Sequence, residues 1–401
     1  MRYFSLNSNI HIWRDDSRAL FFDAAAQRQH LFGLDPESRS VVDALDDVKN
    51  LNSVPLGEDG PVPAIVSGLV ESGLGHIETA TPAGRTRNLP PRYLFPDRLN
   101  TEKKPRFTYL LQYINSVTVY LPGACGNSCR HCDVLYRQGC HCTKNGASAQ
   151  LDLGLLAEKL RVLDNLKRLN LVLSDTAPSR LREAKDLARP DVLTNYYVHW
   201  RNLSTEVIDV LLAGEGLKLI KILVDLSDIP EARLKEVVGL QDRYPDNAVL
   251  VFCITGESDL ALLEKHVDIH ANGNIEIRCV YTGGETEHIR KHYLLDGEDL
   301  KHLTADQNRI FGNRELNYAL FGELVVFPDG SISLNENTGA IGKVEDTWVT
   351  MLSDALNGPN PWLMTRGKTA PCSTCIYRDL CPPIRNLELY MGDTRACIAV
   401  A

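Results

Sequence analysis

The sequence lacks any apolar run long enough for a membrane-spanning helix. It also lacks an N-terminal signal pattern and a lipidation motif, so we expect a cytoplasmic protein. An excess of positive charge is missing too, because 43 Lys and Arg stand against 52 Asp and Glu, for a net charge of −9. Nucleic acids and anionic membranes select basic surfaces, so we expect neither as a partner.

The 401 residues are 44% hydrophobic and 24% charged, which is ordinary for a globular protein and long enough for two or three domains. What stands out is the distribution of the 11 cysteines. Five lie between positions 125 and 142, and four lie after position 370. Only Cys253 and Cys279 stand alone, in apolar strand-like runs that predict buried, inert thiols. Clustered cysteines in a cytoplasmic chain indicate metal binding rather than disulfides.

The first group, Cys125, Cys129 and Cys132, has C-x3-C-x2-C spacing and follows a strand-like segment at 116–121 and a Pro-Gly turn. One short loop with this spacing can present three thiolates to an iron–sulfur cluster and leave one iron without a protein ligand. A zinc site and three free thiols are the alternatives.

The second group comprises Cys372, Cys375, Cys381 and, after fifteen intervening residues, Cys397. Four thiolates saturate a cluster or a zinc ion, so this group predicts a closed site that is structural or transfers electrons.

Between these groups, strand and helix patterns alternate, which predicts parallel β-α units. Six strands are expected, at 116–121, 169–173, 196–200, 217–224, 249–254 and 275–281. Helices are expected between them, at 153–166, 178–188, 204–213, 229–241 and 257–266. A hairpin at 321–334 and a helix at 347–356 should follow.

Residues 1–80 predict a small α+β domain, with strands at 10–13 and 19–22 and helices that begin near Pro36 and Pro63. Residues 81–109 are rich in Pro, Arg and Asn and predict a linker.

The cysteine loop after the first of six β-α units resembles the signature of radical S-adenosylmethionine (SAM) enzymes. The resemblance implies an α/β fold with a partial (β/α)6 TIM-like barrel over 110–312. It also implies that Cys125, Cys129 and Cys132 hold a [4Fe–4S] cluster whose open iron binds SAM and reductively cleaves it to a 5′-deoxyadenosyl radical.

The same resemblance implies the SAM contacts. The family's Gly-Gly-Glu motif after the second strand is absent, and Ser174 and Asp175 stand there as substitute acceptors. Glu257, after the fifth strand, resembles the adenine- and ribose-side contact region. His131 stands where the family often has an aromatic residue near the adenine.

Residues 313–401 resemble the auxiliary-cluster domain, called SPASM, of peptide-modifying radical SAM enzymes. Asn335 and Arg385 stand where cysteines of that domain's first cluster would be, whereas the second group matches the second cluster's full set. One auxiliary [4Fe–4S] cluster is therefore favoured over zinc. Residues 1–80 resemble, in arrangement, the winged-helix module that binds leader peptides; a plain capping domain is the alternative.

The expected function is hydrogen abstraction from a ribosomal precursor peptide, with a flavodoxin or ferredoxin as electron donor. The alternative is a pseudo-radical-SAM partner that binds leader peptide or a radical SAM enzyme as scaffold or electron relay. A zinc-stabilised binding protein is a third reading. Cys140 and Cys142 are either spare loop thiols, a thiol relay or a source of an extra ligand.

Overall fold

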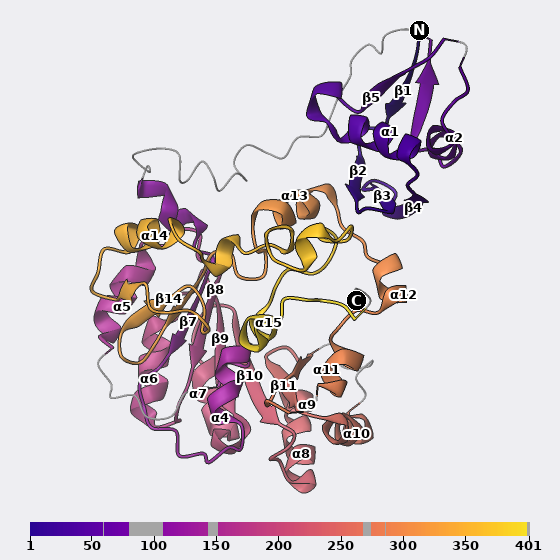
Figure 1. Ribbon diagram of the computed structural model, residues 1–401. Helices are drawn as coiled ribbons and strands as arrows, with labels where there is room; N and C mark the ends of the chain where they lie inside the picture. Colours follow the sequence, from indigo (N-terminus) through magenta and orange to yellow (C-terminus); the bar gives the residue numbers. More distant parts are fainter. Residues whose placement is uncertain (59, 80–106, 143–150, 268–273, 285, 399–401) are drawn as a thin grey trace.

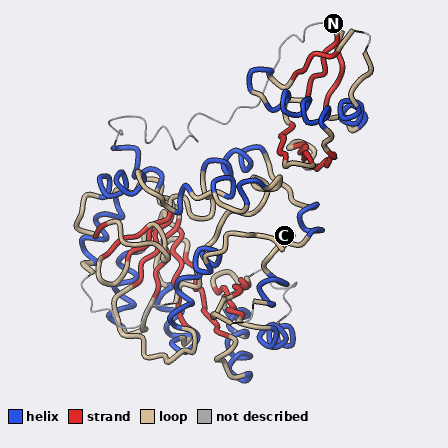
Figure 2. Tube along the Cα trace, viewed as in Figure 1, coloured by secondary structure: helices blue, strands red, loops and turns tan. Residues whose placement is uncertain are grey.

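The computed structural model describes residues 1–58, 60–79, 107–142, 151–267, 274–284 and 286–398, and it is an α/β protein (Figure 1). One large sheet has nine strands in the order β12-β11-β10-β9-β8-β7-β13-β14-β15. Two small antiparallel sheets form a separate N-terminal unit at one corner of the molecule (Figure 2). Most of the predicted linker lies outside the described residues. Within the described part of the chain, no helix combines the length and apolar character needed to cross a membrane.

Seven neighbouring strands of the large sheet are parallel, and all six predicted parallel strands are confirmed. They are β7 (Ser116–Tyr120), β8 (Arg168–Val172), β9 (Leu193–His199), β10 (Lys218–Asp225), β11 (Ala248–Ile254) and β12 (Ile275–Cys279). The predicted hairpin is also present, as β13 (Glu323–Val326) and β14 (Ser331–Ser333), and β15 (Gly342–Lys343) extends it. Because β13 pairs in parallel with β7, the hairpin continues the large sheet.

Helices connect the strands and pack on one face of the large sheet. They are α5 (Leu153–Arg161), α6 (Pro178–Leu187), α7 (Thr205–Leu212), α8 (Glu231–Val238), α9 (Leu240–Arg243), α10 (Glu257–His266) and, after the hairpin, α14 (Trp348–Leu356). Asp152 and Ser204 cap α5 and α7 by accepting from backbone N–H groups. Apolar helix residues such as Leu156 and Ile208 join strand residues such as Leu171 in one buried core.

The opposite face of the large sheet carries many polar side chains. Successive side chains along a strand point to opposite faces, so each strand that buries apolar residues under the helices presents its alternate residues to the other side. On β8 and β9 these are Arg168, Asn170, Asn195 and Tyr197, and on β12 they include Glu276. This polar inner face lines a cavity.

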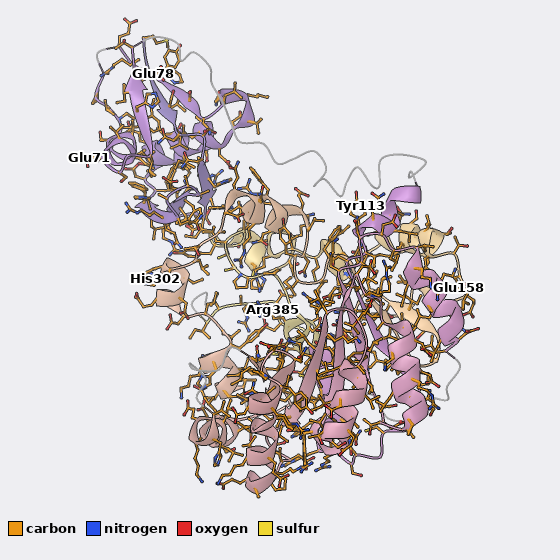
Figure 3. All side chains as sticks on the ribbon, turned by 180° about the vertical axis from the view of Figure 1, so that it is seen from behind. Glu71, Glu78, Tyr113, Glu158, His302 and Arg385 are labelled. Carbon is orange, nitrogen blue, oxygen red and sulfur yellow. The ribbon has the colours of Figure 1, made fainter. Side chains whose placement is uncertain are left out.

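The N-terminal unit contains two sheets and two helices. The sheets consist of β1 (Arg2–Leu6), β5 (Ser53–Leu56) and β6 (Gly75–Glu78), and of β2 (Ile10–Arg14), β3 (Arg18–Asp23) and β4 (Arg28–Gly33). The helices are α1 (Pro36–Asp46) and α2 (Ala64–Glu71), so the predicted strands and helices are confirmed. Phe4, Phe21, Val42 and Leu69 belong to its core. Figure 3 shows Glu71 and Glu78 in this unit, remote from Glu158 on α5.

A smaller apolar cluster joins the N-terminal unit to the C-terminal part of the chain. Trp13, Leu20 and Phe22 of the N-terminal unit pack against Ile310 and Ile376. The remaining helices on the C-terminal side are α11 (Glu287–His292), α12 (Gly297–Lys301), α13 (Gln307–Glu315) and α15 (Asn386–Met391), and α4 (Cys132–Leu135) follows the cysteine loop.

Candidate metal centres

The loop that carries Cys125 and Cys129 lies across the carboxyl ends of β8 and β9. At its start, Gly123 has φ +149, and a Cβ there would lie 2.1 Å from Ser174 Oγ, so the close approach requires glycine. Ser174 Oγ donates to the Pro122 carbonyl at 3.3 Å. Asn127 Nδ2 donates to Asn202 Oδ1 at 3.1 Å, just beyond β9. The loop therefore lies at the edge formed by the carboxyl ends of the parallel strands, where open α/β sheets bind their ligands.

Two of the three loop cysteines are in direct contact. Cys129 packs against Cys132, and the interaction between the two thiols lowers the pKa of Cys132 and raises the pKa of Cys129. His199, at the end of β9, also reaches Cys129. Its Nδ1 accepts from the Arg201 amide at 3.2 Å, so its proton lies on Nε2, which is 3.4 Å from Cys129 Sγ. Burial lowers the pKa of His199 to about 4, so this imidazole is neutral. Cys125 is half-exposed on the same loop.

Three further cysteines lie behind the loop in a buried thiol layer. Cys140, Cys142 and Cys253 pack in one cluster with Cys132, together with Leu223, Val251 and Val280. The neighbouring Cys132 and burial raise the pKa of Cys142, and the neighbouring Cys140 and burial raise the pKa of Cys253. Cys253 is buried as predicted, but it is not isolated. Cys253 lies near the end of β11, on the inner face, and its contact with the other cysteines was not predicted from the sequence.

The predicted SAM contacts are not all at the loop. Ser174 and Asp175 lie beside Gly123, and Asp175 Oδ1 accepts from a backbone N–H at 3.0 Å at the start of α6. Glu257 is exposed on α10, where its carboxylate pairs with Lys291 at 3.3 Å and His292 at 2.9 Å. These two partners hold Glu257 against α11.

Asp225, which the sequence reasoning missed, ends β10 and is fully buried. Its Oδ1 accepts from Ser227 N at 3.1 Å and Ser227 Oγ at 2.7 Å, whereas its Oδ2 has no partner among the described residues. Burial raises its pKa, and the hydrogen bonds from Ser227 oppose that effect. His131 directly precedes α4. An unpartnered buried oxygen beside the loop is an acceptor for a ligand's O–H or N–H group.

All four cysteines of the second group line one small cavity: Cys372, Cys375, Cys381 and Cys397. Tyr377 N donates to Cys375 Sγ at 3.4 Å. No group of three or more described His, Cys, Asp or Glu side chains is arranged to hold a metal ion.

A buried ion pair lies beside the second cysteine group. Arg366 and Glu388 are each about 3% exposed at the side chain and lie 2.8 Å apart. Arg366 also lines the cavity of the four cysteines and donates to the carbonyl groups of Pro382 and Thr394. Glu388 accepts from Arg385 N at 2.9 Å. The pair thus ties together the chain segments that carry Cys381 and Cys397.

Comparison with models of protein families gives no match for this chain. No curated protein is significantly similar to it in sequence either.

Proposed function

We propose that this protein is a radical SAM enzyme that modifies a ribosomally made peptide, with the parallel strands serving as its partial (β/α)6 barrel. One observation carries the proposal: a loop with three cysteines lies across the carboxyl ends of parallel strands, one of which ends in the buried Asp225, whose Oδ2 has no partner among the described residues. When bound, the cluster and SAM would supply a 5′-deoxyadenosyl radical for hydrogen abstraction.

Each residue at the loop has a role in this proposal. Cys125, Cys129 and Cys132 would hold the cluster, and His199 donates to the sulfur of Cys129. Asp225 Oδ2 would accept a hydrogen bond from a hydroxyl or amino group of SAM. The apolar neighbours in the thiol layer exclude water from the inner side of the loop.

The second cysteine group would hold an auxiliary [4Fe–4S] cluster that passes electrons or helps bind the peptide. The N-terminal unit would hold the leader segment of the precursor, and it docks on the chain between Cys375 and Cys381, because Trp13 contacts Asp379 there. A flavodoxin or ferredoxin in the cytoplasm would supply electrons.

A second candidate function is that of a pseudo-radical-SAM partner, which binds leader peptide or a radical SAM enzyme without cleaving SAM. Two observations favour this second function: the Gly-Gly-Glu motif is absent after the second strand, and Ser174 and Asp175, which stand in its place, are engaged elsewhere. Ser174 donates to the Pro122 carbonyl and Asp175 accepts from Ala177 N, so both already have partners within the protein.

SAM cleavage separates the two functions. The full chain, reconstituted with iron and sulfide without oxygen, would be reduced with dithionite in the presence of SAM and assayed for 5′-deoxyadenosine by mass spectrometry. If the protein is an enzyme, product should be lost in Cys129→Ala and retained in Lys235→Gln, an exposed change on α8 outside both cysteine groups and the cavity of the large sheet. Absence of product from the iron-loaded wild type would favour the partner reading.

A further inference from the structure

The polar inner face of the large sheet and the C-terminal segment enclose a cavity of about 960 Å³. Gln138 closes one side, because its amide donates to the Tyr281 carbonyl at 2.8 Å and accepts from Tyr281 N at 2.7 Å. The cavity extends from the beginnings of β8 and β10 to Cys279 at the end of β12. It lies behind the thiol layer, because Gly139 and His141 line it while the intervening Cys140 is packed in that layer.

Cations outnumber carboxylates in this cavity. Its lining includes the five cations Arg168, Lys221, Arg278, Arg366 and Arg385, and the three carboxyl groups Glu276, Glu323 and Glu388. The chain as a whole has a net charge of −9, so this excess of positive charge is local. Clefts lined by one sign of charge concentrate ligands of the opposite sign.

The ion pairs within the cavity leave positive charge uncompensated. Lys221 and Arg278 share the single carboxylate of Glu276, with Arg278 Nη2 at 2.8 Å from Glu276 Oε2. Among the described residues, neither Arg168 nor Arg385 forms an ion pair. Figure 3 shows Arg385 close to the strands. Burial raises the pKa of Glu323 to about 7, so its carboxyl group offsets only part of a charge at neutral pH.

A hydrogen-bond chain across the sheet ends in an unused acceptor. Asn170 Nδ2 donates to Thr118 Oγ1 at 3.0 Å, and Asn195 Nδ2 donates to Asn170 Oδ1 at 2.8 Å. Asn195 is only 3% exposed, it lines the cavity, and its Oδ1 has no partner among the described residues. A ligand that satisfies this oxygen must donate an N–H or O–H group.

We propose that this cavity binds an acidic residue of a peptide, with its side-chain carboxylate facing Arg168 and Arg278 and a peptide N–H donating to Asn195 Oδ1. The guanidinium group of an arginine can donate two parallel hydrogen bonds to one carboxylate. Asn195 Oδ1 favours a ligand that also donates a hydrogen bond. The proposal rests on the proposed function, because it names the chemical class of the substrate segment. Inorganic phosphate, which carries both negative charge and an O–H group at neutral pH, is the competing ligand in the test.

The test uses the full chain and two capped tripeptides, N-acetyl-Gly-Glu-Gly-amide and N-acetyl-Gly-Gln-Gly-amide, titrated by NMR. The Glu peptide is expected to bind at least about tenfold more tightly, since hydrogen bonds to charged groups are the stronger ones. Arg168→Gln should abolish this preference and Arg168→Lys should keep most of it. Glu276→Gln, which removes a competing carboxylate, should tighten binding of the Glu peptide. Arg233→Gln, an exposed change on α8, is the matched control and should have no effect.

Equal binding of both peptides, no binding of either, or phosphate binding as tight as that of the Glu peptide would each overturn the proposal. Binding needs neither cluster nor SAM, so the outcome is separate from the cleavage assay. Glu-selective binding without SAM cleavage would leave the cavity assignment standing and refute the enzyme reading. SAM cleavage without Glu-selective binding would support the enzyme function and refute the cavity assignment.

Discussion

The contact between Trp13 and Asp379 is predicted to hold the N-terminal unit on the segment between two cysteines of the second group. Trp13 Nε1 donates to Asp379 Oδ2 at 2.7 Å, and the two residues are about 2% and 3% exposed. Arg314 Nε also donates to Asp379 Oδ2, at 2.7 Å, so the carboxylate keeps a cationic partner when Trp13 is changed. The free energy of the interaction between the Trp13 N–H and the Asp379 carboxylate should therefore be that of one hydrogen bond to a charged group, about 1.5–3 kcal/mol. The larger cost of an unpaired buried charge should not arise.

A double-mutant cycle of Trp13→Phe and Asp379→Ala measures this contact directly. The assay is native-state hydrogen exchange of the amides of β3, because undocking should expose the face of the sheet that packs on α13. The two changes should couple by about 1.5–3 kcal/mol, and Trp13→Phe should be additive with Asp346→Ala, a control at a separate surface. Additivity of Trp13→Phe and Asp379→Ala to within about 0.5 kcal/mol would refute the reasoning.

Three other results are expected. Arg366→Met should lower the free energy of unfolding in urea by about 3–5 kcal/mol, because it leaves Glu388 buried without its counter-charge; a change under about 1 kcal/mol would contradict this. Burial raises the pKa of Glu336 from 4.5 to about 7, so the unfolded chain loses this proton first and stability falls as pH rises between these values. Glu336→Gln should remove about 3 kcal/mol of that fall, and an unchanged pH slope would count against the assignment. N-Ethylmaleimide should label the half-exposed Cys125 in the native metal-free protein but label Cys253, which is fully buried, only after unfolding, whereas equal rates would disprove the burial.

The order of strands and helices could be predicted because local patterns encode it. The strand bounds agree with prediction to within a few residues, since runs such as Val249–Ile254 are apolar and end in turn residues. The parallel pairing of β13 with β7 was not predicted, because it joins segments about 200 residues apart and leaves no mark in either one. The strands β1, β4, β5 and β6 were also missed. Their sequences, which include Pro55 in β5 and Gly75 in β6, lack an alternation of apolar and polar residues.

The candidate site was only partly predictable. Spacing along the sequence identified both cysteine groups, because their members are close in the chain, and the structure places all four members of the second group around one cavity. Asp225, His199 and Cys253 contribute through the strand ends that the fold brings together, so no local spacing reveals them. Glu257 was chosen by its position after a strand, but the first residue of a helix can face its neighbour, here α11.

The most direct test of the central proposal is an EPR spectrum of the reduced protein with and without SAM. A variant with the four cysteines of the second group changed to alanine would leave the loop cysteines as the proposed cluster-binding group, and Asp225→Asn in that background would probe the carboxylate whose Oδ2 has no partner among the described residues. We predict a cluster signal that shifts when SAM is added and shifts less in the Asp225→Asn protein. A signal that SAM leaves unchanged would contradict the proposal that the loop holds an open, SAM-binding cluster.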